Sequence, residues 1–211
     1  MTTTPERRIA ARDELGRAMA SRRHALVIHY ACEGFEKPDR RVTAIAARNL
    51  GTGATTCFEL ETELRCAGLD PAHASEADLD RHERKMLDSF YTFVRQHRDH
   101  YWLHWNMRDT TFGFASLQNR QKALGGRSAP IAEQYRIDLA SRMVDLHGDN
   151  YADPKRRLSD LAGHNGLVVT HLIDGTAQAE RLQNRDFASV TRSLGSRSEP
   201  AREHRFRQSR R

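Results

Sequence analysis

Ala25-Leu-Val-Ile-His-Tyr30 is a nearly continuous apolar run that leads into Ala31-Cys-Glu33-Gly34. Short uninterrupted runs of this kind are typical of strands in the middle of a covered sheet. Residues 41–48 are rich in small and β-branched side chains, and residues 55–61 alternate in polarity, so both predict further strands. Between them, Asn49-Leu-Gly-Thr-Gly53 supplies residues that tolerate positive φ. We therefore expect the three strands to form an antiparallel meander.

Helical patterns surround the predicted strands. Ser75-Glu-Ala-Asp78 is similar to a capping box, and the apolar residues from Leu79 to Val94 fall on one helical face. Aromatic, aliphatic and polar side chains alternate over residues 101–105, which predicts a fourth strand. Further helices are predicted from Thr4-Pro5 onward, at 113–124, at 137–147, from Pro154 onward and at 171–185. This order of elements predicts an α/β fold with a mixed sheet flanked by helices.

Length and composition fit one domain with short appendages. The chain has 211 residues, 38% of them apolar, which suffices for one substantial core. We expect an N-terminal helical extension at 1–24, a domain at 25–186 and a tail at 187–211. No run approaches the roughly 18 apolar residues that cross a bilayer, and no apolar signal core is present, so we expect a cytoplasmic protein without a membrane partner. Cys32, Cys57 and Cys66 are expected to be reduced thiols.

The positive charge of the chain is concentrated near its C-terminus. The net charge is +6, and residues 187–211 hold seven arginines against two glutamates, which accounts for five of these charges. Such a segment is expected to be disordered and able to hold phosphates electrostatically, or to contact a protein partner. The phosphate-contacting candidates are Arg205, Arg207, Arg210 and Arg211. A solvated tail with no dedicated partner is the alternative.

Several segments resemble one family in the order in which they occur. They are Glu33-Gly34 after the first strand, the long amphipathic helix, Trp102-Leu-His-Trp-Asn106, Ile137-Asp-Leu-Ala140 and Leu158-Ser-Asp-Leu-Ala162. Together, over about residues 25–185, they resemble the DEDD-type 3′–5′ exonucleases of the ribonuclease H-like superfamily. The resemblance implies a ribonuclease H-like sheet and a site in which carboxylates hold two Mg²⁺ or Mn²⁺ ions for phosphodiester hydrolysis.

The acidic positions of that family are only partly kept in this chain. The first acid falls on Ala31 and the second on Glu33. The third falls on Gly113 or, with a different spacing, on Asp109. In the last helix, the family carries a histidine or tyrosine followed by an aspartate. The histidine falls on His171 and the position of the aspartate falls on Thr176, with Asp174 close by. The resemblance thus implies catalytic roles for Glu33, Asp109, His171 and Asp174, and metal ligands drawn from Glu33, Asp109, Asp174 and, in an outer shell, Asp138.

Each of these residues also has a plain structural interpretation. Asp109 precedes a predicted helix, where aspartate is a frequent N-cap, and Asp138 lies in the first helical turn, where the helix dipole favours a negative charge. His104, Trp105 and Asn106 are candidates for contacting nucleic acid in a cleft, although dense aromatic residues often fill a core.

Three functions remain open from the sequence. The first is a nucleic-acid-binding ribonuclease H-like domain whose exonuclease site is degenerate and needs no cofactor. The second is an active 3′–5′ exonuclease dependent on Mg²⁺ or Mn²⁺. The third is a protein-interaction scaffold with no nucleic-acid role. Whether the nucleic acid is DNA or RNA is not determined by any of these residues.

Overall fold

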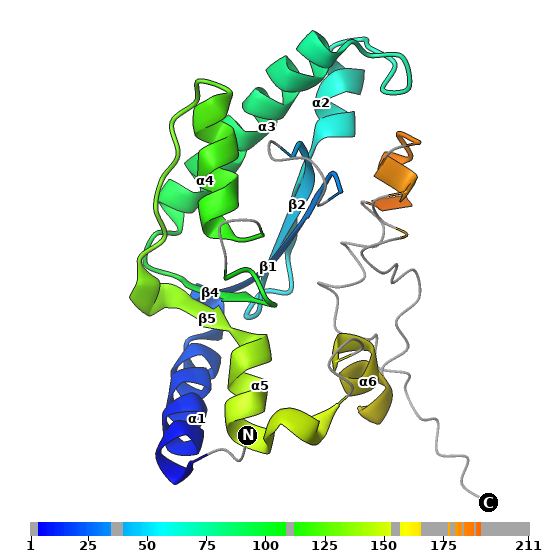
Figure 1. The fold of residues 1–211 in the computed structure, drawn as a ribbon. Coiled ribbons are helices and arrows are strands. Elements are labelled where there is room, and N and C mark those ends of the chain that lie inside the picture. Colours follow the sequence, from blue (N-terminus) through cyan, green and yellow to red (C-terminus); the bar gives the residue numbers. More distant parts are fainter. Residues whose placement is uncertain are drawn as a thin grey trace, which may run out of the picture.

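The computed structural model describes residues 4–34, 40–108, 112–152, 157–165, 177, 180–182, 184–187 and 189–190. Within them lies a five-stranded sheet in the order β3-β2-β1-β4-β5 (Figure 1). Its strands are β1 (Ala25–Cys32), β2 (Val42–Asn49), β3 (Thr55–Glu59), β4 (Tyr101–His104) and β5 (Arg136–Asp138). The first three strands form the predicted antiparallel meander, and β4 and β5 run parallel to β1. The α/β class with a mixed sheet is confirmed, and the arrangement is compatible with a ribonuclease H-like fold.

Helices cover both faces of this sheet. They are α1 (Pro5–Ala20), α2 (Leu60–Cys66), α3 (Glu76–Gln96), α4 (Phe114–Ala123), α5 (Leu139–His147) and α6 (Arg157–His164), together with short 3-10 turns at η1 (Arg22–His24), η2 (Glu133–Tyr135) and η3 (Asp149–Tyr151). In Figure 1, α3 and α4 lie on one side of β4 and β5, and α1 and α5 lie on the other.

The alternation of side chains along the strands explains these two layers. On β4, Trp102 is buried in the core formed with α3 and α4, whereas the next residue, Leu103, packs with Ala18 of α1. Ile137 of β5 joins Leu103 on that second face. Because successive strand residues point to opposite faces, both sides of the sheet carry apolar residues and both need a helical cover.

The long helix α3 begins where the sequence predicts it. The backbone N–H of Asp78 donates to the Ser75 hydroxyl over 3.2 Å, so Ser75 is the N-cap. The helix then buries Leu79, Met86 and Phe90, among others, on the predicted apolar face. The N-cap and the buried face of α3 therefore both agree with the helix that the sequence predicts.

Two predicted elements differ from the structure. A helix was expected from residue 137, but Arg136–Asp138 forms β5, because these residues pair in parallel with Trp102–His104 and the fully buried Ile137 fills the core. A strand was expected to reach residue 61, but it ends at Glu59 and α2 begins at Leu60. Leu60 and Leu64, four residues apart, are both buried, which a helix permits on one face.

The core extends at both ends of the predicted domain. Phe187 and Val190, the described residues of the expected tail that are buried, belong to the main core. At the other end, α1 packs on α5 and is held by ion pairs from Arg7 to Asp145 and from Arg142 to Glu14. Among the described helices, none has the length and apolar character that crossing a bilayer requires.

The turn between β2 and β3 packs tightly on η1, which leaves no room for a side chain at Gly51. A Cβ at Gly51 lies 2.7 Å from both Cα and N of Arg23. We expect Gly51→Ala to lower the free energy of unfolding by about 1–3 kcal/mol, since backbone must shift. Gly16→Ala is the matched control: Gly16 is exposed in α1 with nothing within 4 Å, so a helix-favouring change of about 0.5–1 kcal/mol in the opposite direction is expected. Chemical denaturation measures both, and equal effects would contradict the prediction.

Candidate functional site

The carboxyl ends of β4 and β5 lie side by side at one end of the sheet, and β1, which is parallel to them, continues past β4 from Val27 to Cys32. The three strands are parallel, and His104 at the end of β4 is in register with Asp138 at the end of β5. Residues 105–108 continue from β4, and α5 continues from β5. In open α/β sheets this edge is the usual location of ligand sites, because the loops that leave the strands gather there.

Asp138 is the centre of a hydrogen-bonded cluster at this edge. Its Oδ1 accepts the backbone N–H of Asn106 over 3.0 Å and that of Ala140 over 3.2 Å. Its Oδ2 accepts the Ser141 hydroxyl over 2.7 Å and lies 2.9 Å from Nε of Arg108. Asp138 is 9% exposed and is the N-cap of α5, one residue before the first helical turn in which the sequence placed it. Four donors therefore saturate this carboxylate.

The same cluster fixes Arg108 in one orientation. Its Nη1 donates to the Ser141 hydroxyl and its Nη2 donates to the Asn106 side-chain carbonyl, each over 2.9 Å. Asn106 has a left-handed backbone with φ 55°, a conformation that asparagine tolerates better than most residues. The Arg108 side chain is nevertheless 59% exposed. Asp138 thus holds a solvent-facing guanidinium whose free movement is restricted on three sides.

His104 lies beneath this cluster and does not face the solvent. It is 4% exposed, its Nδ1 accepts the backbone N–H of Met107 over 3.2 Å, and its ring meets Phe114 edge to face at 5.3 Å. Burial lowers the pKa of His104 to about 4, although the Asp138 carboxylate, 3.8 Å away, acts in the opposite direction. His104 is therefore a neutral core residue, and the contact with nucleic acid that the sequence suggested for it is not available without rearrangement.

Glu33 belongs to a second cluster, which contains acids and arginines. Its Oε1 lies 3.1 Å from Nη1 of Arg41. Arg41 Nη2 also lies 2.7 Å from Asp80 and 3.0 Å from Glu76, both on α3. Burial alone would lower the pKa of Arg41, but the hydrogen bond to Asp80 and the charges of Glu33 and its neighbours raise it. Glu33, the acid that best matched the family's metal ligands, is thus paired with Arg41.

Glu83 is the buried member of this acid–arginine cluster. Its side chain is fully buried. Arg120 of α4 donates two hydrogen bonds to it, from Nε to Oε1 over 2.9 Å and from Nη2 to Oε2. The backbone N–H of Val42 donates to Oε1 over 2.7 Å. Burial raises the pKa of Glu83 even though Arg120, Val42 and Arg41 lower it. Sequence reasoning missed this cluster, although Glu76, Asp80 and Glu83 follow helical spacing beside the apolar face of α3.

The described residues do not bring the predicted metal ligands together. Glu33 is paired with Arg41, and Asp138 is saturated by four donors. In the part of the chain that the structure describes, no group of three or more histidine, cysteine or acidic side chains is placed to hold a metal ion. Asp109, His171, Asp174, Arg205, Arg207, Arg210 and Arg211 lie outside the described residues. A Mg²⁺ or Mn²⁺ site that uses Asp109 and Asp174 therefore stays a prediction.

Trp105 and Asn106 are the predicted contact residues that reach the surface. Asn106 is exposed and Trp105 is half-buried. Within the described residues, no aromatic ring packs on Trp105, whereas Trp102 is enclosed by Phe90 and Phe93. Arg108 was not predicted, because nothing in its sequence spacing connects it with Asp138. We refer to Trp105, Asn106 and Arg108 as the edge turn. Comparisons of the chain with protein-family models, curated proteins and solved structures found no match.

Proposed function

We propose that this protein is a nucleic-acid-binding domain of ribonuclease H-like architecture that binds a strand through the edge turn without hydrolysing it. One observation carries the proposal: Asp138 fixes both the backbone of Asn106 and the guanidinium of Arg108 beside the half-buried Trp105. A guanidinium has five N–H donors. Asp138, Ser141 and Asn106 engage three of them, which leaves two for a phosphate.

The chemistry of the edge turn suits a single strand. A half-buried aromatic ring can stack on any base with the part that solvent reaches, and an oriented arginine can bind the adjacent phosphate without reading sequence. Asp138 acts as a positioning residue, since it orients groups that contact the ligand. Preorganised side chains lose less conformational entropy on binding than mobile ones.

The pairing of the acids supports the absence of hydrolysis in this proposal. Two-metal cleavage needs carboxylates whose oxygens are available to the ions. Arg41 engages Oε1 of Glu33 and Arg108 engages Oδ2 of Asp138, so a metal ion at either acid would compete with a guanidinium. Glu33 directly follows β1 and Asp138 ends β5, and both strands run parallel to β4.

The test compares Trp105→Ala and Arg108→Gln with the wild type by fluorescence anisotropy, using labelled single strands of DNA and RNA of about 16 nucleotides in EDTA. Loss of one stacked base is expected to weaken binding about tenfold in Trp105→Ala. Loss of one phosphate contact should reduce the slope of log K against log salt by about 0.7 in Arg108→Gln. Arg81→Gln is the matched control, because Arg81 is also exposed and pairs with an aspartate, Asp78.

Two outcomes would contradict this function. Folded wild-type protein that binds neither DNA nor RNA at about 50 mM salt would remove nucleic acid as the partner and favour a protein scaffold. Degradation of a 3′-labelled strand in Mg²⁺ or Mn²⁺, absent in EDTA and in Glu33→Ala, would show an active exonuclease instead.

A further inference from the structure

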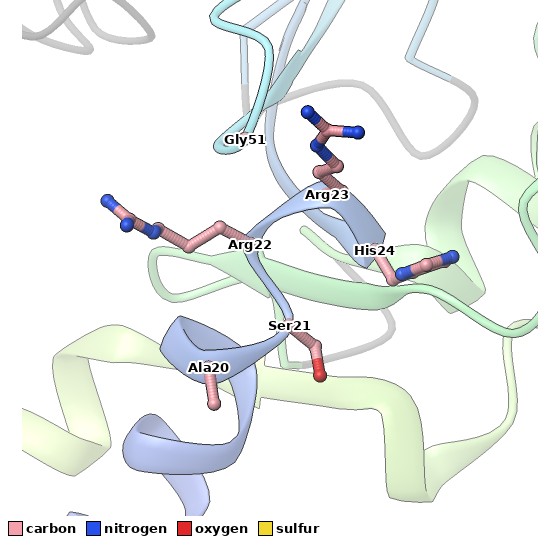
Figure 2. A pocket seen from close by; sticks show the side chains of 6 residues that line it. All are labelled: Ala20, Ser21, Arg22, Arg23, His24 and Gly51. Atoms are coloured by element: carbon pink, nitrogen blue, oxygen red, sulfur yellow. The ribbon is translucent and has the colours of Figure 1, made fainter.

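A basic hollow lies at the amino ends of the parallel strands, whereas the edge turn follows the carboxyl end of β4. It has a volume of about 530 Å³ and is lined by Ala20, Ser21, Arg22, Arg23, His24 and Gly51, as Figure 2 shows. This volume is in the range of ligand sites. η1 directly precedes β1, so the hollow lies at the amino ends of the parallel strands. The described residues that line it include no acidic residue.

The two arginines of the hollow differ from those of the acid–arginine cluster. Within the described residues, neither Arg22 nor Arg23 has an ion-pair partner, whereas Arg41 and Arg120 each contact several carboxylates. Figure 2 shows the side chains of Arg22 and Arg23 extending to different sides of the turn, both away from the backbone. Two uncompensated charges on adjacent residues produce a positive potential that attracts polyanions.

The backbone that carries these arginines is held from three directions. Ser21 N–H donates to the Arg17 carbonyl over 3.1 Å, and His24 N–H donates to the Ser21 carbonyl over 2.7 Å. From the turn between β2 and β3, the Asn49 side-chain amide donates to the Arg23 carbonyl over 2.8 Å, and Gly51 packs against the Arg23 backbone. The charged side chains therefore project from a fixed platform.

We propose that this hollow is a second phosphate-binding surface, which holds the phosphodiester backbone of the same nucleic-acid strand that contacts the edge turn. The inference rests on the proposed function. His24 and His100 are neighbours, with ring centroids 5.1 Å apart, and the chain runs from His100 through β4 to Trp105. Five residues of extended chain span roughly 17 Å, so one strand of several nucleotides can reach both surfaces.

The arginines also have a purely structural interpretation. They follow the carboxyl end of α1, where a cation is favoured by the helix dipole. That role predicts a small loss of stability when they are removed and no change in affinity for nucleic acid. The two roles are therefore separated by measuring binding and unfolding on the same variants.

The experiment measures binding of the 16-nucleotide strands by Arg22→Ala/Arg23→Ala, with Arg8→Ala/Arg12→Ala as control. Arg8 and Arg12 are exposed on α1, so the control removes the same charge from the neighbouring helix. Two lost phosphate contacts should reduce the salt slope by about 1.4 and weaken binding about tenfold or more at low salt, while the control keeps the wild-type slope.

The possible results are distinct. If Trp105→Ala weakens binding but Arg22→Ala/Arg23→Ala matches the wild type, the hollow is not a phosphate site and the proposed function stands. Equal losses in Arg8→Ala/Arg12→Ala and Arg22→Ala/Arg23→Ala would show long-range charge instead of a site. If the wild type binds no nucleic acid, both proposals are rejected together. A selective loss in Arg22→Ala/Arg23→Ala with unchanged unfolding supports the second surface.

Discussion

Replacing Arg120 with methionine is expected to lower the free energy of unfolding by about 3–5 kcal/mol at pH 7. The reason is that Arg120 grips Glu83 with two nitrogens while Glu83 is fully buried. Methionine keeps much of the apolar stem but removes the charge, so the carboxylate retains only Val42 N–H and the more distant Arg41, 3.6 Å away. A buried charge that loses its main partner costs far more than the pair contributes when intact.

Urea denaturation followed by circular dichroism measures this loss. Arg84→Met is the matched control, because Arg84 and Asp88 form a half-exposed pair 3.8 Å apart and such pairs contribute at most about 0.5 kcal/mol. Adding Glu83→Gln to Arg120→Met should recover part of the loss by removing the buried charge. A change below about 1 kcal/mol in Arg120→Met would mean that Glu83 is already neutral in the wild type.

Lowering the pH from about 6.5 to about 4 is expected to remove about 3 kcal/mol of stability through His104 alone. Burial lowers the pKa of His104 in the folded protein to about 4, below its value in an unfolded chain. Between these two values the unfolded chain binds the extra proton, so the free energy of unfolding falls as the pH falls. Above the unfolded value both states hold a neutral ring, and the stability is fully present.

The measurement compares urea denaturation of wild type and His104→Asn across this pH range. Asparagine does not titrate there, and its carbonyl can still accept the Met107 N–H that His104 Nδ1 accepts. The variant loses packing against Phe114 at every pH, so the difference in stability between the two proteins should shrink as the pH falls. His147→Asn, at an exposed position of α5, is the control for the exchange itself. A constant difference for His104→Asn would disprove the assignment.

Local patterns were sufficient to predict most of the fold. The meander follows from three strand-like runs joined by a turn that suits them, and α3 follows from its N-cap and apolar face. β5 was missed because it is only three residues long, and its pairing with β4 depends on residues more than thirty positions away. Tertiary pairing of this kind overrides a local helical pattern.

The candidate site was less predictable, for a physical reason. The sequence marks acids, but it does not show which cation each acid will meet. Glu83 and Arg120 are 37 residues apart, and only the packing of α3 against α4 brings them together. The same holds for Asp138 and Arg108, which become neighbours when β4 pairs with β5. Trp105 and Asn106, predicted as contacts, do reach the surface, whereas His104 beside them does not.

The acid–arginine cluster also determines what chelators can do to this part of the protein. The positive charges that balance Glu33, Asp80 and Glu83 belong to Arg41 and Arg120, which are covalently part of the chain. A bound ion is lost when its free concentration drops, but a side chain stays at the same effective concentration under all conditions. A chelator that removes free metal ions therefore leaves Arg41 and Arg120 in place between β2, α3 and α4.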